Sequence, residues 1–429
     1  MFTSPLDSHR LETLYNLKRN DIKYDLSVMK IFDEFLNKPH QSFSSIHVAG
    51  TNGKGSTASL IFNIIRERYR AGLYTSPHLR RFNERIFVHD REITDLEIED
   101  FLNKVDGFIK ENIKNDRNPT FFEVTTELAF NTFKENKIDF GVIEVGLGGR
   151  LDATNVIEPR VSVITKIGFD HADRLGGTLQ SIAFEKAGII KNGKPTVTSE
   201  IKNEAISEIR TIAKRKNSKL TEIKNSCKVN NVSISEEGLS FDLKTDKNEY
   251  EIQSKLIGDF QIDNICSAVK AIEESGIDID QIDIQNGIKK ARWVGRFEII
   301  RKAPRIILDC SHNPPAANSL SISYNKIFND NPILLIGMLS DKDHYSYMRN
   351  IRKISNRVIF TRPAEPGRSL DPNILMTESG SLFKEAKVIE DPVEAYEYSK
   401  SLGEPLLVTG SMYLVGVVTE IENINTFPY

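Results

Sequence analysis

The feature that most constrains this chain is a glycine-rich segment, residues 50–57 (GTNGKGST), between an apolar run and a helix-like stretch. Residues 45–49 form the apolar run and read as a strand, and residues 56–69 show the spacing of a helix. Glycines let the backbone turn its N–H groups inward around phosphate oxygens, and a helix N-terminus adds partial positive charge. Strand, glycine turn and helix together predict a nucleotide-binding α/β domain, with Gly72 ending the helix.

The chemistry of this loop rests on one lysine and one hydroxyl. Lys54 is placed to neutralise the β- and γ-phosphates of a nucleotide, and the Ser56 hydroxyl is placed to bind Mg²⁺. The spacing departs from a standard Walker A motif, because only two residues separate Gly50 from Gly53. Gly55 also intervenes before the serine. The alternative interpretation is a plain glycine turn that carries a solvated lysine.

Apolar runs and helix-length segments alternate along most of the chain. The strand candidates are residues 139–145, 161–166, 195–198, 305–308, 333–336, 357–360, 386–389 and 405–408. The helix candidates include residues 11–36, 123–134, 178–190, 262–274 and 279–291. Nearly continuous apolar strands separated by helices predict parallel sheets with crossover helices. Residues 218–254 differ, because their alternating apolar and polar side chains predict short antiparallel strands.

The chain has 429 residues, which exceeds the usual size of one domain, so the length alone predicts two or three. The alternation of strand and helix restarts after Trp293, and five strands within about 120 residues are enough for a separate doubly wound domain. We therefore predict an α/β protein with a phosphate-loop ATPase domain over residues 1–295. A smaller Rossmann-like α/β domain is expected over residues 296–429.

Charge and composition argue against several classes of function. Lysine and arginine total 57 against 60 acidic residues, for a net charge of -3, so no basic face for nucleic acid is implied. No apolar run is long enough to cross a membrane, and the polar N-terminal residues carry no secretion signal. Cys227, Cys266 and Cys310 form no CxxC pair, which favours reduced thiols in a cytoplasmic protein.

Several segments resemble, in order along the chain, the folylpolyglutamate synthase/dihydrofolate synthase family of the Mur-ligase superfamily. They are AGTNGKGST (49–57), YTSPHLRRFNERI (74–86), FFEVTTELAF (121–130), IEVGLGGRLDATNV (143–156), FDHADRLGGTLQSIAFEKAGIIK (169–191), GDFQIDNICSA (258–268), WVGRFE (293–298) and LDCSHNP (308–314). The glycine between Lys54 and Ser56 is the variant typical of this family. The resemblance covers nearly the whole chain and implies an ATPase domain of the Mur-ligase type before a C-terminal domain of the glutamate-ligase type.

The resemblance implies a set of magnesium ligands. Residues that match Ser56, Ser76, Glu144 and His171 hold Mg²⁺ in the family, and the lysine that matches Lys186 is typically carbamylated. A carbamate offers oxygen ligands, whereas an ammonium offers none. Two Mg²⁺ ions are expected, with a monovalent cation as a further candidate. From the residues alone, the glutamate is also read as a solvated strand-end carboxylate, the histidine as structural, and the lysine as an ion-pair partner.

The ATP site that the resemblance implies extends beyond the loop. Its expected members are Thr51, Asn52, Gly53, Lys54, Gly55, Ser56, Thr57, Asn264, Arg296 and Asp309. The expected catalytic residues are Lys54, Lys186 and His312, and the histidine is expected to stabilise charge during transfer and not to act as the base. Without the resemblance, Arg296 reads as an ion-pair residue between the domains. Asp309 and His312 then read as ordinary polar residues at a strand end.

Two further sets of residues are expected to bind the substrates. Phe122, Glu123, Thr126, Leu151, Asp152 and Ala153 match segments that line the pteridine site in bifunctional members of the family. Ser340, Asp341, Lys342 and Ser411 follow strands of the second domain and are expected to bind the incoming amino acid. The alternative for Phe122 is a core residue on a helix face.

The resemblance implies an ATP-dependent ligase that works through an acyl phosphate. L-glutamate would be joined to dihydropteroate, to the γ-carboxyl of reduced folates, or to both. We expect the bifunctional enzyme, with a folylpolyglutamate synthase alone as the close alternative. The competing classes are a cell-wall ligase and a non-catalytic phosphate-loop switch. A switch would not need Glu144, His171 and Lys186, and it would not need a second domain. We further expect a cytoplasmic monomer that binds small molecules, without nucleic acid or membrane partners.

Overall fold

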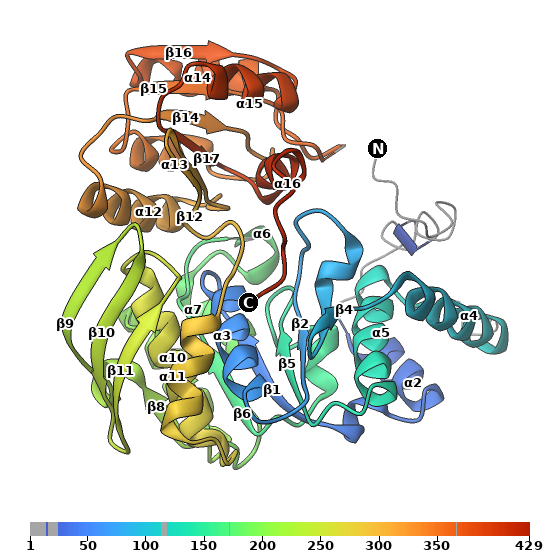
Figure 1. Ribbon diagram of the computed structural model, residues 1–429. Helices are drawn as coiled ribbons and strands as arrows, with labels where there is room; N and C mark the ends of the chain where they lie inside the picture. The colour runs from blue at the N-terminus through green and yellow to red at the C-terminus, as the bar shows by residue number, and fades with distance from the viewer. Residues whose placement is uncertain (1–13, 16–24, 113–117, 171, 366) are drawn as a thin grey trace. The chain divides into compact units, whose positions relative to one another are not determined.

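The computed structural model describes residues 14–15, 25–112, 118–170, 172–365 and 367–429 (Figure 1). Its contacts group the chain into two compact units. The first holds Met1–Lys228, Lys244–Tyr250 and Asn264–Ile288, and the second holds Val229–Leu243, Glu251–Asp263 and Lys289–Tyr429. Each unit combines helices with a largely parallel sheet, so the predicted α/β class is confirmed. The division into domains at residues 295 and 296 stays a prediction.

The first unit is built on an eight-stranded sheet with the order β4-β3-β2-β5-β1-β6-β7-β8. The strands are β1 (Ser44–Ala49), β2 (Ala71–Tyr74), β3 (Ile86–Val88), β4 (Arg91–Glu92), β5 (Phe140–Glu144), β6 (Val161–Ile164), β7 (Thr196–Thr198) and β8 (Leu220–Glu222). From β2 to β8 in this order the pairs are parallel, whereas β2–β3 and β3–β4 are antiparallel. The carboxyl ends of β2, β5, β1 and β6 therefore share one edge of the sheet.

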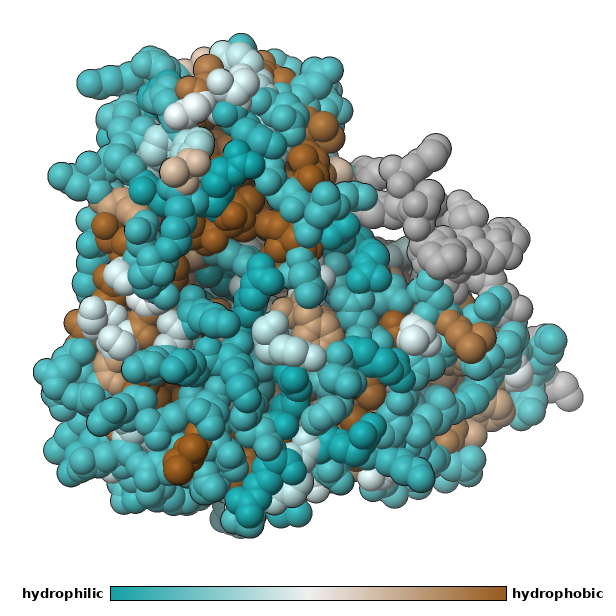
Figure 2. All heavy atoms as spheres, in the orientation of Figure 1, coloured by the Kyte–Doolittle hydropathy of each residue, from teal (hydrophilic) through white to brown (hydrophobic). Residues whose placement is uncertain are grey.

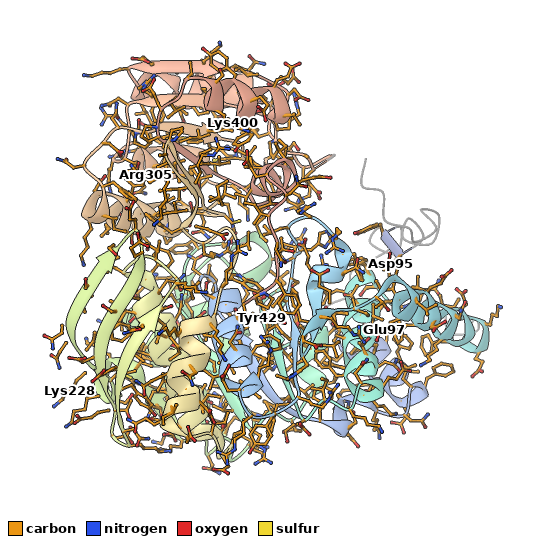
Figure 3. All side chains as sticks on the ribbon, in the orientation of Figure 1. Asp95, Glu97, Lys228, Arg305, Lys400 and Tyr429 are labelled. Carbon is orange, nitrogen blue, oxygen red and sulfur yellow. The ribbon has the colours of Figure 1, made fainter. Side chains whose placement is uncertain are left out.

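Helices in the first part of the chain flank this sheet (Figure 1). They are α2 (Ser27–Phe35), α3 (Lys54–Arg66), α4 (Asp95–Asn112), α5 (Phe121–Glu135), α6 (Ala172–Leu175), α7 (Leu179–Ala187), α8 (Asn203–Arg215), α9 (Ile223–Ser226), α10 (Phe260–Ser275) and α11 (Gln281–Lys290). Short 3-10 turns lie at Pro39–Ser42, Phe82–Arg85 and Ala153–Val156. The first turn of α4 carries Asp95 and Glu97 (Figure 3), where carboxylates interact favourably with the helix dipole.

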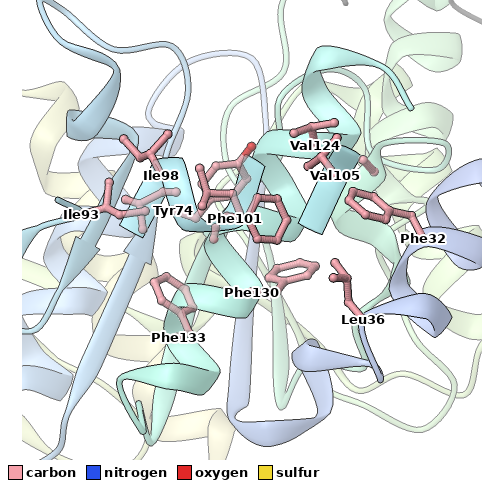
Figure 4. Close-up of a cluster of buried hydrophobic side chains, with 14 of the residues drawn as sticks. Phe32, Leu36, Tyr74, Ile93, Ile98, Phe101, Val105, Val124, Phe130 and Phe133 are labelled. Atoms are coloured by element: carbon pink, nitrogen blue, oxygen red, sulfur yellow. The ribbon is translucent and has the colours of Figure 1, made fainter. Parts of the chain in front are cut away.

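Aromatic side chains form a large part of the core on one side of this sheet (Figure 4). Phe32 of α2 lies 4.6 Å from the ring of Phe108 on α4, and Phe133 of α5 packs against the strands. A Cβ at Gly72 would lie 2.7 Å from Phe133, so the glycine lets the ring rest on β2. The expectation that Gly72 ends the preceding helix is therefore wrong, because α3 ends at Arg66 and the glycine is a strand residue.

A small three-stranded sheet precedes α10, with the order β11-β10-β9. Its strands are β9 (Lys228–Ser235), β10 (Gly238–Lys244) and β11 (Glu249–Ser254). Buried and exposed side chains alternate along β11, as expected for a sheet with one covered face. The alternating pattern of residues 218–254 therefore predicted these three strands, but it was wrong for residues 220–222, which form β8 and pair in parallel with β7.

The second unit contains a six-stranded sheet with the order β12-β13-β17-β14-β15-β16. Its strands are β12 (Glu298–Lys302), β13 (Arg305–Leu308), β14 (Ile333–Ile336), β15 (Arg357–Phe360), β16 (Glu385–Val388) and β17 (Leu406–Thr409). All pairs are parallel except β12–β13. The helices are α12 (Pro314–Ile327), α13 (His344–Ile351), α14 (Pro372–Ser379), α15 (Pro392–Ser401) and α16 (Met412–Ile421), with a 3-10 turn at Gly380–Leu382.

Side-chain caps fix where these helices begin. Asn313 accepts a hydrogen bond from the amide of Ala316 at the start of α12, and Ser411 accepts one from Leu414 at the start of α16. Hydrophilic residues predominate on the face of the molecule drawn in Figure 2. Among the helices that the structure describes, none is both long and apolar enough to cross a bilayer.

Candidate active site

The glycine-rich loop of the first unit joins β1 directly to α3. Gly53 caps the helix in a left-handed conformation with φ 91°, which glycine adopts without the steric cost of a side chain. A Cβ at this position would lie 2.4 Å from Oδ1 of Asn264 on α10. Asn264 also accepts a hydrogen bond of 3.4 Å from the Thr57 hydroxyl. Two of the expected ATP contacts are thus packed against each other around the loop.

The loop is tied to the segment that follows β6. The amide of Thr51 donates to the carbonyl of Lys166 at 2.8 Å, and the Thr51 hydroxyl accepts from the amide of Gly168 at 3.0 Å. Asn52 forms a bridge with the same lysine backbone. Lys54 Nζ donates to the Thr51 carbonyl at 3.3 Å, so its ammonium lies over the turn. These contacts with the segment after β6 and within the turn hold the loop in shape.

Three expected metal ligands follow central strands of the sheet at their carboxyl ends. Glu144 ends β5 and is buried, and its Oε2 accepts a hydrogen bond of 3.3 Å from the amide of Ser76, which follows β2. The Ser56 hydroxyl is buried in the first turn of the neighbouring α3. His171 lies outside the described residues.

Lys186 of α7 also reaches this edge. Its Nζ donates to the carbonyl of Gly50 at 2.8 Å, although the two residues are 136 positions apart. Burial, and to a smaller extent the nearby Lys54, lower the pKa of Lys186 to about 7, although Asp170 and Asp152 oppose the shift. The amine is therefore far easier to deprotonate than that of an exposed lysine.

A cavity of about 550 Å³ opens beside the same edge, and it is lined mainly by apolar surface. Its walls include the expected site residues Ser76, Phe122, Glu123, Leu151, Asp152 and Ala153. A Cβ at Gly146 would lie 2.3 Å from the ring of Phe122, so the glycine turn after β5 lets this ring approach the backbone closely. The size and lining suit a flat organic ligand.

Several of the expected substrate residues also have structural partners. Asp152 is buried and accepts hydrogen bonds from the amides of Leu147 and Thr154, so it holds the glycine turn in shape. Burial raises the pKa of Asp152. The Glu123 carboxylate caps α5 by accepting from the amide of Thr120 at 2.7 Å. These bonds place both carboxylates firmly on the cavity wall.

Thr126 does not belong to the cavity wall. Its hydroxyl donates to the carbonyl of Phe122 at 2.8 Å and lies 3.3 Å from the hydroxyl of Tyr74. Both threonine and tyrosine are buried in the α5 packing. The side chain thus supports the helix that carries the cavity residues.

Charged side chains that the sequence reasoning did not single out also line the cavity. They are Asp25, Arg85, Arg150, Arg174 and Glu185. Arg85 is buried, its Nε donates to Nδ1 of His78 at 2.9 Å, and its guanidinium lies 5.3 Å from the ring of Phe121. Arg85, Arg150, Arg174 and Glu185 occur inside the motif segments, but only the folded structure shows that they line the cavity.

The second unit collects its own group of expected residues at the carboxyl end of β13. Asp309 is buried, and its carboxylate accepts from the amides of Phe297 and Ser311 at 2.9 Å each. Burial raises the pKa of Asp309, and Arg296 opposes this shift. His312 donates from Nδ1 to the carbonyl of Cys310 at 3.0 Å, which directs Nε2 away from that backbone.

The expected amino-acid contacts follow the neighbouring strands of the same sheet. Ser411 follows β17 and caps α16. Asp341 lies after β14, within 3.7 Å of Lys342 and 3.4 Å of Arg368. The amide of Ser340 donates to the carbonyl of Arg368, which joins this loop to the one after β15. Parallel pairing of β13, β17 and β14 brings all three groups to one edge of the sheet.

Known proteins match this chain along almost its full length. A model of the Mur ligase middle domain matches residues 48–272, and one of the Mur ligase, glutamate ligase domain matches residues 295–412. The dihydrofolate synthase/folylpolyglutamate synthase of Bacillus subtilis is 34% identical over 97% of this chain and 98% of its own length.

Solved structures agree with this assignment. The folylpolyglutamate synthase of Thermotoga maritima is 37% identical, with a TM-score of 0.86 over 98% of both chains. Escherichia coli FolC in complex with DHPP and ADP is 29% identical, with a TM-score of 0.85 over 99% of both chains. The resemblance inferred from the motifs is therefore confirmed. The chain belongs to the dihydrofolate synthase/folylpolyglutamate synthase family, whose members are ATP-dependent ligases of the Mur-ligase type.

Proposed function

We propose that this protein uses ATP to join L-glutamate to dihydropteroate and to the γ-carboxyl of reduced folates. The acceptor carboxylate attacks the γ-phosphorus of ATP, ADP leaves, and the acyl phosphate then accepts the α-amine of glutamate while phosphate departs. Relatives named for both activities support this proposal, as does the relative that binds DHPP and ADP together.

The observation that carries the proposal is the shared edge of the loop and the cavity. Ser76 lines the cavity and its amide donates to Glu144, while Lys186, on the neighbouring helix, donates to Gly50 of the glycine-rich loop. A flat acceptor in the cavity would therefore extend its carboxylate toward the phosphates held at the start of α3. Proximity of this kind is what phosphoryl transfer requires from the protein.

Residues of the loop are proposed to hold the triphosphate. The backbone N–H groups of residues 51–57 and the positive end of α3 would bind the phosphate oxygens. Lys54 would neutralise the charge of the transferring phosphoryl group, and Asn264 supports the turn at Gly53. Arg296 and Asp309 of the second unit are proposed as the remaining ATP contacts.

The donor atoms at the edge fit magnesium. Ser56 offers a buried hydroxyl and Glu144 a buried carboxylate, and hard oxygen ligands of this kind, together with phosphates and water, are what Mg²⁺ prefers. Ser76 and His171 complete the proposed set, with a monovalent cation as a further candidate. When bound, the ions would supply positive charge to the phosphates.

Lys186 is proposed to be carbamylated. Only a neutral amine can add carbon dioxide, and the pKa of about 7 makes that form abundant at neutral pH. A carbamate at the end of this buried side chain would add oxygen donors beside Gly50.

Residues 1–295 are proposed to carry the nucleotide, the metals and the acceptor, and residues 296–429 the amino acid. Ser340, Asp341, Lys342 and Ser411 would bind glutamate, and His312 would stabilise charge as the amine attacks. Exclusion of water is essential, because water destroys an acyl phosphate. We also propose that the protein acts as a cytoplasmic monomer.

The test is a product assay with dihydropteroate and tetrahydrofolate in separate tubes, each with ATP and L-glutamate. Glutamylated product in both tubes is expected. Product from tetrahydrofolate alone would refute the bifunctional proposal and assign a folylpolyglutamate synthase. ATP hydrolysis that needs neither acceptor nor glutamate would instead indicate a phosphate-loop switch, and refute ligation altogether.

A further inference from the structure

Three buried hydroxyls form a closed ring at the carboxyl edge of the sheet in the second unit. Ser311 Oγ lies 3.2 Å from the hydroxyl of Tyr347 and 3.0 Å from Oγ1 of Thr409. The third side closes at 2.9 Å between the tyrosine and threonine hydroxyls. We call Ser311, Tyr347 and Thr409 the hydroxyl ring. Its members come from the loop after β13, from α13, and from the end of β17.

The ring satisfies all of its members without help from water. Each hydroxyl can donate one hydrogen bond and accept another, so three hydroxyls in a triangle can form a complete cycle. All three side chains are buried, and burial raises the pKa of Tyr347, so the phenol keeps the proton that it donates. Loss of one hydroxyl leaves its two neighbours with unmet hydrogen bonds at a buried site.

The segments that the ring joins are those with the expected amino-acid contacts. Ser311 precedes His312, and Thr409 lies two residues before Ser411. A backbone hydrogen bond also joins the loops after β13 and β17, because the amide of Gly410 donates to the carbonyl of Ser311 at 3.0 Å. Tyr347 adds the third element, since α13 begins directly after the loop that contains Lys342.

We propose that Tyr347 is a positioning residue, which through the hydroxyl ring holds the loops after β13 and β17 at the separation that glutamate binding requires. This inference rests on the proposed function. Asp309 is bonded to one ring residue, because its carboxylate accepts from the amides of Phe297 and Ser311. These two bonds involve neither Tyr347 nor Thr409, so these two hydroxyls serve the amino-acid side of the unit more than the proposed nucleotide contact.

The test compares Tyr347→Phe with wild type in the ligation assay. This substitution removes the phenol oxygen and keeps the aromatic side chain. The KM for L-glutamate is expected to rise about tenfold, while the affinity for ADP changes less than about twofold. Thr409→Val should give a similar rise and Thr409→Ser should restore most of the affinity, because serine keeps the hydroxyl. The double variant Tyr347→Phe/Thr409→Val should have a KM for glutamate close to that of either single variant, since loss of one hydroxyl already interrupts the cycle of hydrogen bonds.

Tyr324→Phe is the matched control. Tyr324 is also buried in the second unit, but its hydroxyl contacts Asp330 and Arg305. The KM of the Tyr324→Phe variant for glutamate should equal that of wild type. An unchanged KM for glutamate in Tyr347→Phe and Thr409→Val would overturn the inference, and so would strictly additive losses in the double variant. If wild type ligates no glutamate, the proposed function fails; if wild type ligates and these variants behave as wild type, only the positioning role fails. Should Tyr347→Phe not fold, the two Thr409 variants decide.

Discussion

The substitution Gly53→Ala tests whether the shape of the glycine-rich loop determines nucleotide binding. Gly53 has φ 91° and caps α3, so alanine there would sit in a left-handed conformation that costs about 1–2 kcal/mol. The new methyl group would lie 2.4 Å from Asn264 Oδ1, inside the 3.0 Å limit that real Cβ atoms respect. Asn264 must therefore move, and its bond with Thr57 is lost or the turn itself opens.

The expected effects separate into two parts. The backbone strain should lower the melting temperature by about 2–4 °C for each kcal/mol in a unit of this size. Displacement of the turn should redirect the N–H groups that face the phosphates and weaken ADP binding at least about tenfold, or about 1.4 kcal/mol. Calorimetric titration with ADP and a thermal melt measure the two effects independently.

Gly276→Ala provides the control. Gly276 lies in the same unit with φ 69°, but a Cβ there would meet nothing within 4 Å. This variant should show the strain and bind ADP as wild type does. If Gly53→Ala binds ADP within about twofold of wild type while its melting temperature falls like that of the control, the reasoning about the loop is refuted.

Three further predictions concern buried or loop-bound charges. Lys54→Ala should abolish ligation and leave the melting temperature close to that of wild type, since the ammonium donates to the backbone carbonyl of Thr51; near-normal turnover would contradict the role of this lysine. Carbon-13 NMR with labelled bicarbonate should show a carbamate in wild type and none in Lys186→Ala, and identical spectra would exclude the modification. Glu127 is buried, and neither of its carboxylate oxygens is hydrogen-bonded to a residue that the structure describes. Burial raises its pKa well above 4.5, so the neutral form is favoured in the folded state. The stability that the neutral Glu127 carboxyl contributes is complete below pH 4.5 and is lost as the pH rises toward the folded-state pKa. Glu127→Gln should therefore stabilise the protein more at pH 8 than at pH 5 in thermal melts. An equal effect at the two pH values would show that the carboxyl does not titrate as inferred.

Local sequence patterns were sufficient to predict the strands and helices that have a regular pattern of buried side chains. The apolar runs at residues 305–308, 333–336 and 357–360 coincide with β13, β14 and β15, because a strand covered on both faces needs apolar side chains at every position. The strand at 45–49 and the helix after the glycine-rich loop were likewise readable. Four short strands were missed. β4 and β12 carry partly exposed side chains, which give no such run, and β2 and β3 are buried but only four and three residues long.

The motif residues were also predictable, but their partners were not. Nothing near Lys186 in the sequence shows that its amine meets the carbonyl of Gly50, because that contact depends on how α7 packs at the end of β1. The same applies to Arg85, which the motifs contain but only the folded cavity identifies as a buried charge.

By itself, the sequence determined the family, the α/β class and the chemistry available at the glycine-rich loop, because each of these follows from residue types at short spacing. Only the tertiary structure decided the order of the strands, the cavity beside Ser76, and the hydroxyl ring that joins residues 98 positions apart. The physical reason is that short-range patterns encode backbone conformation and burial. The neighbours of a buried polar atom are chosen by packing across the whole unit.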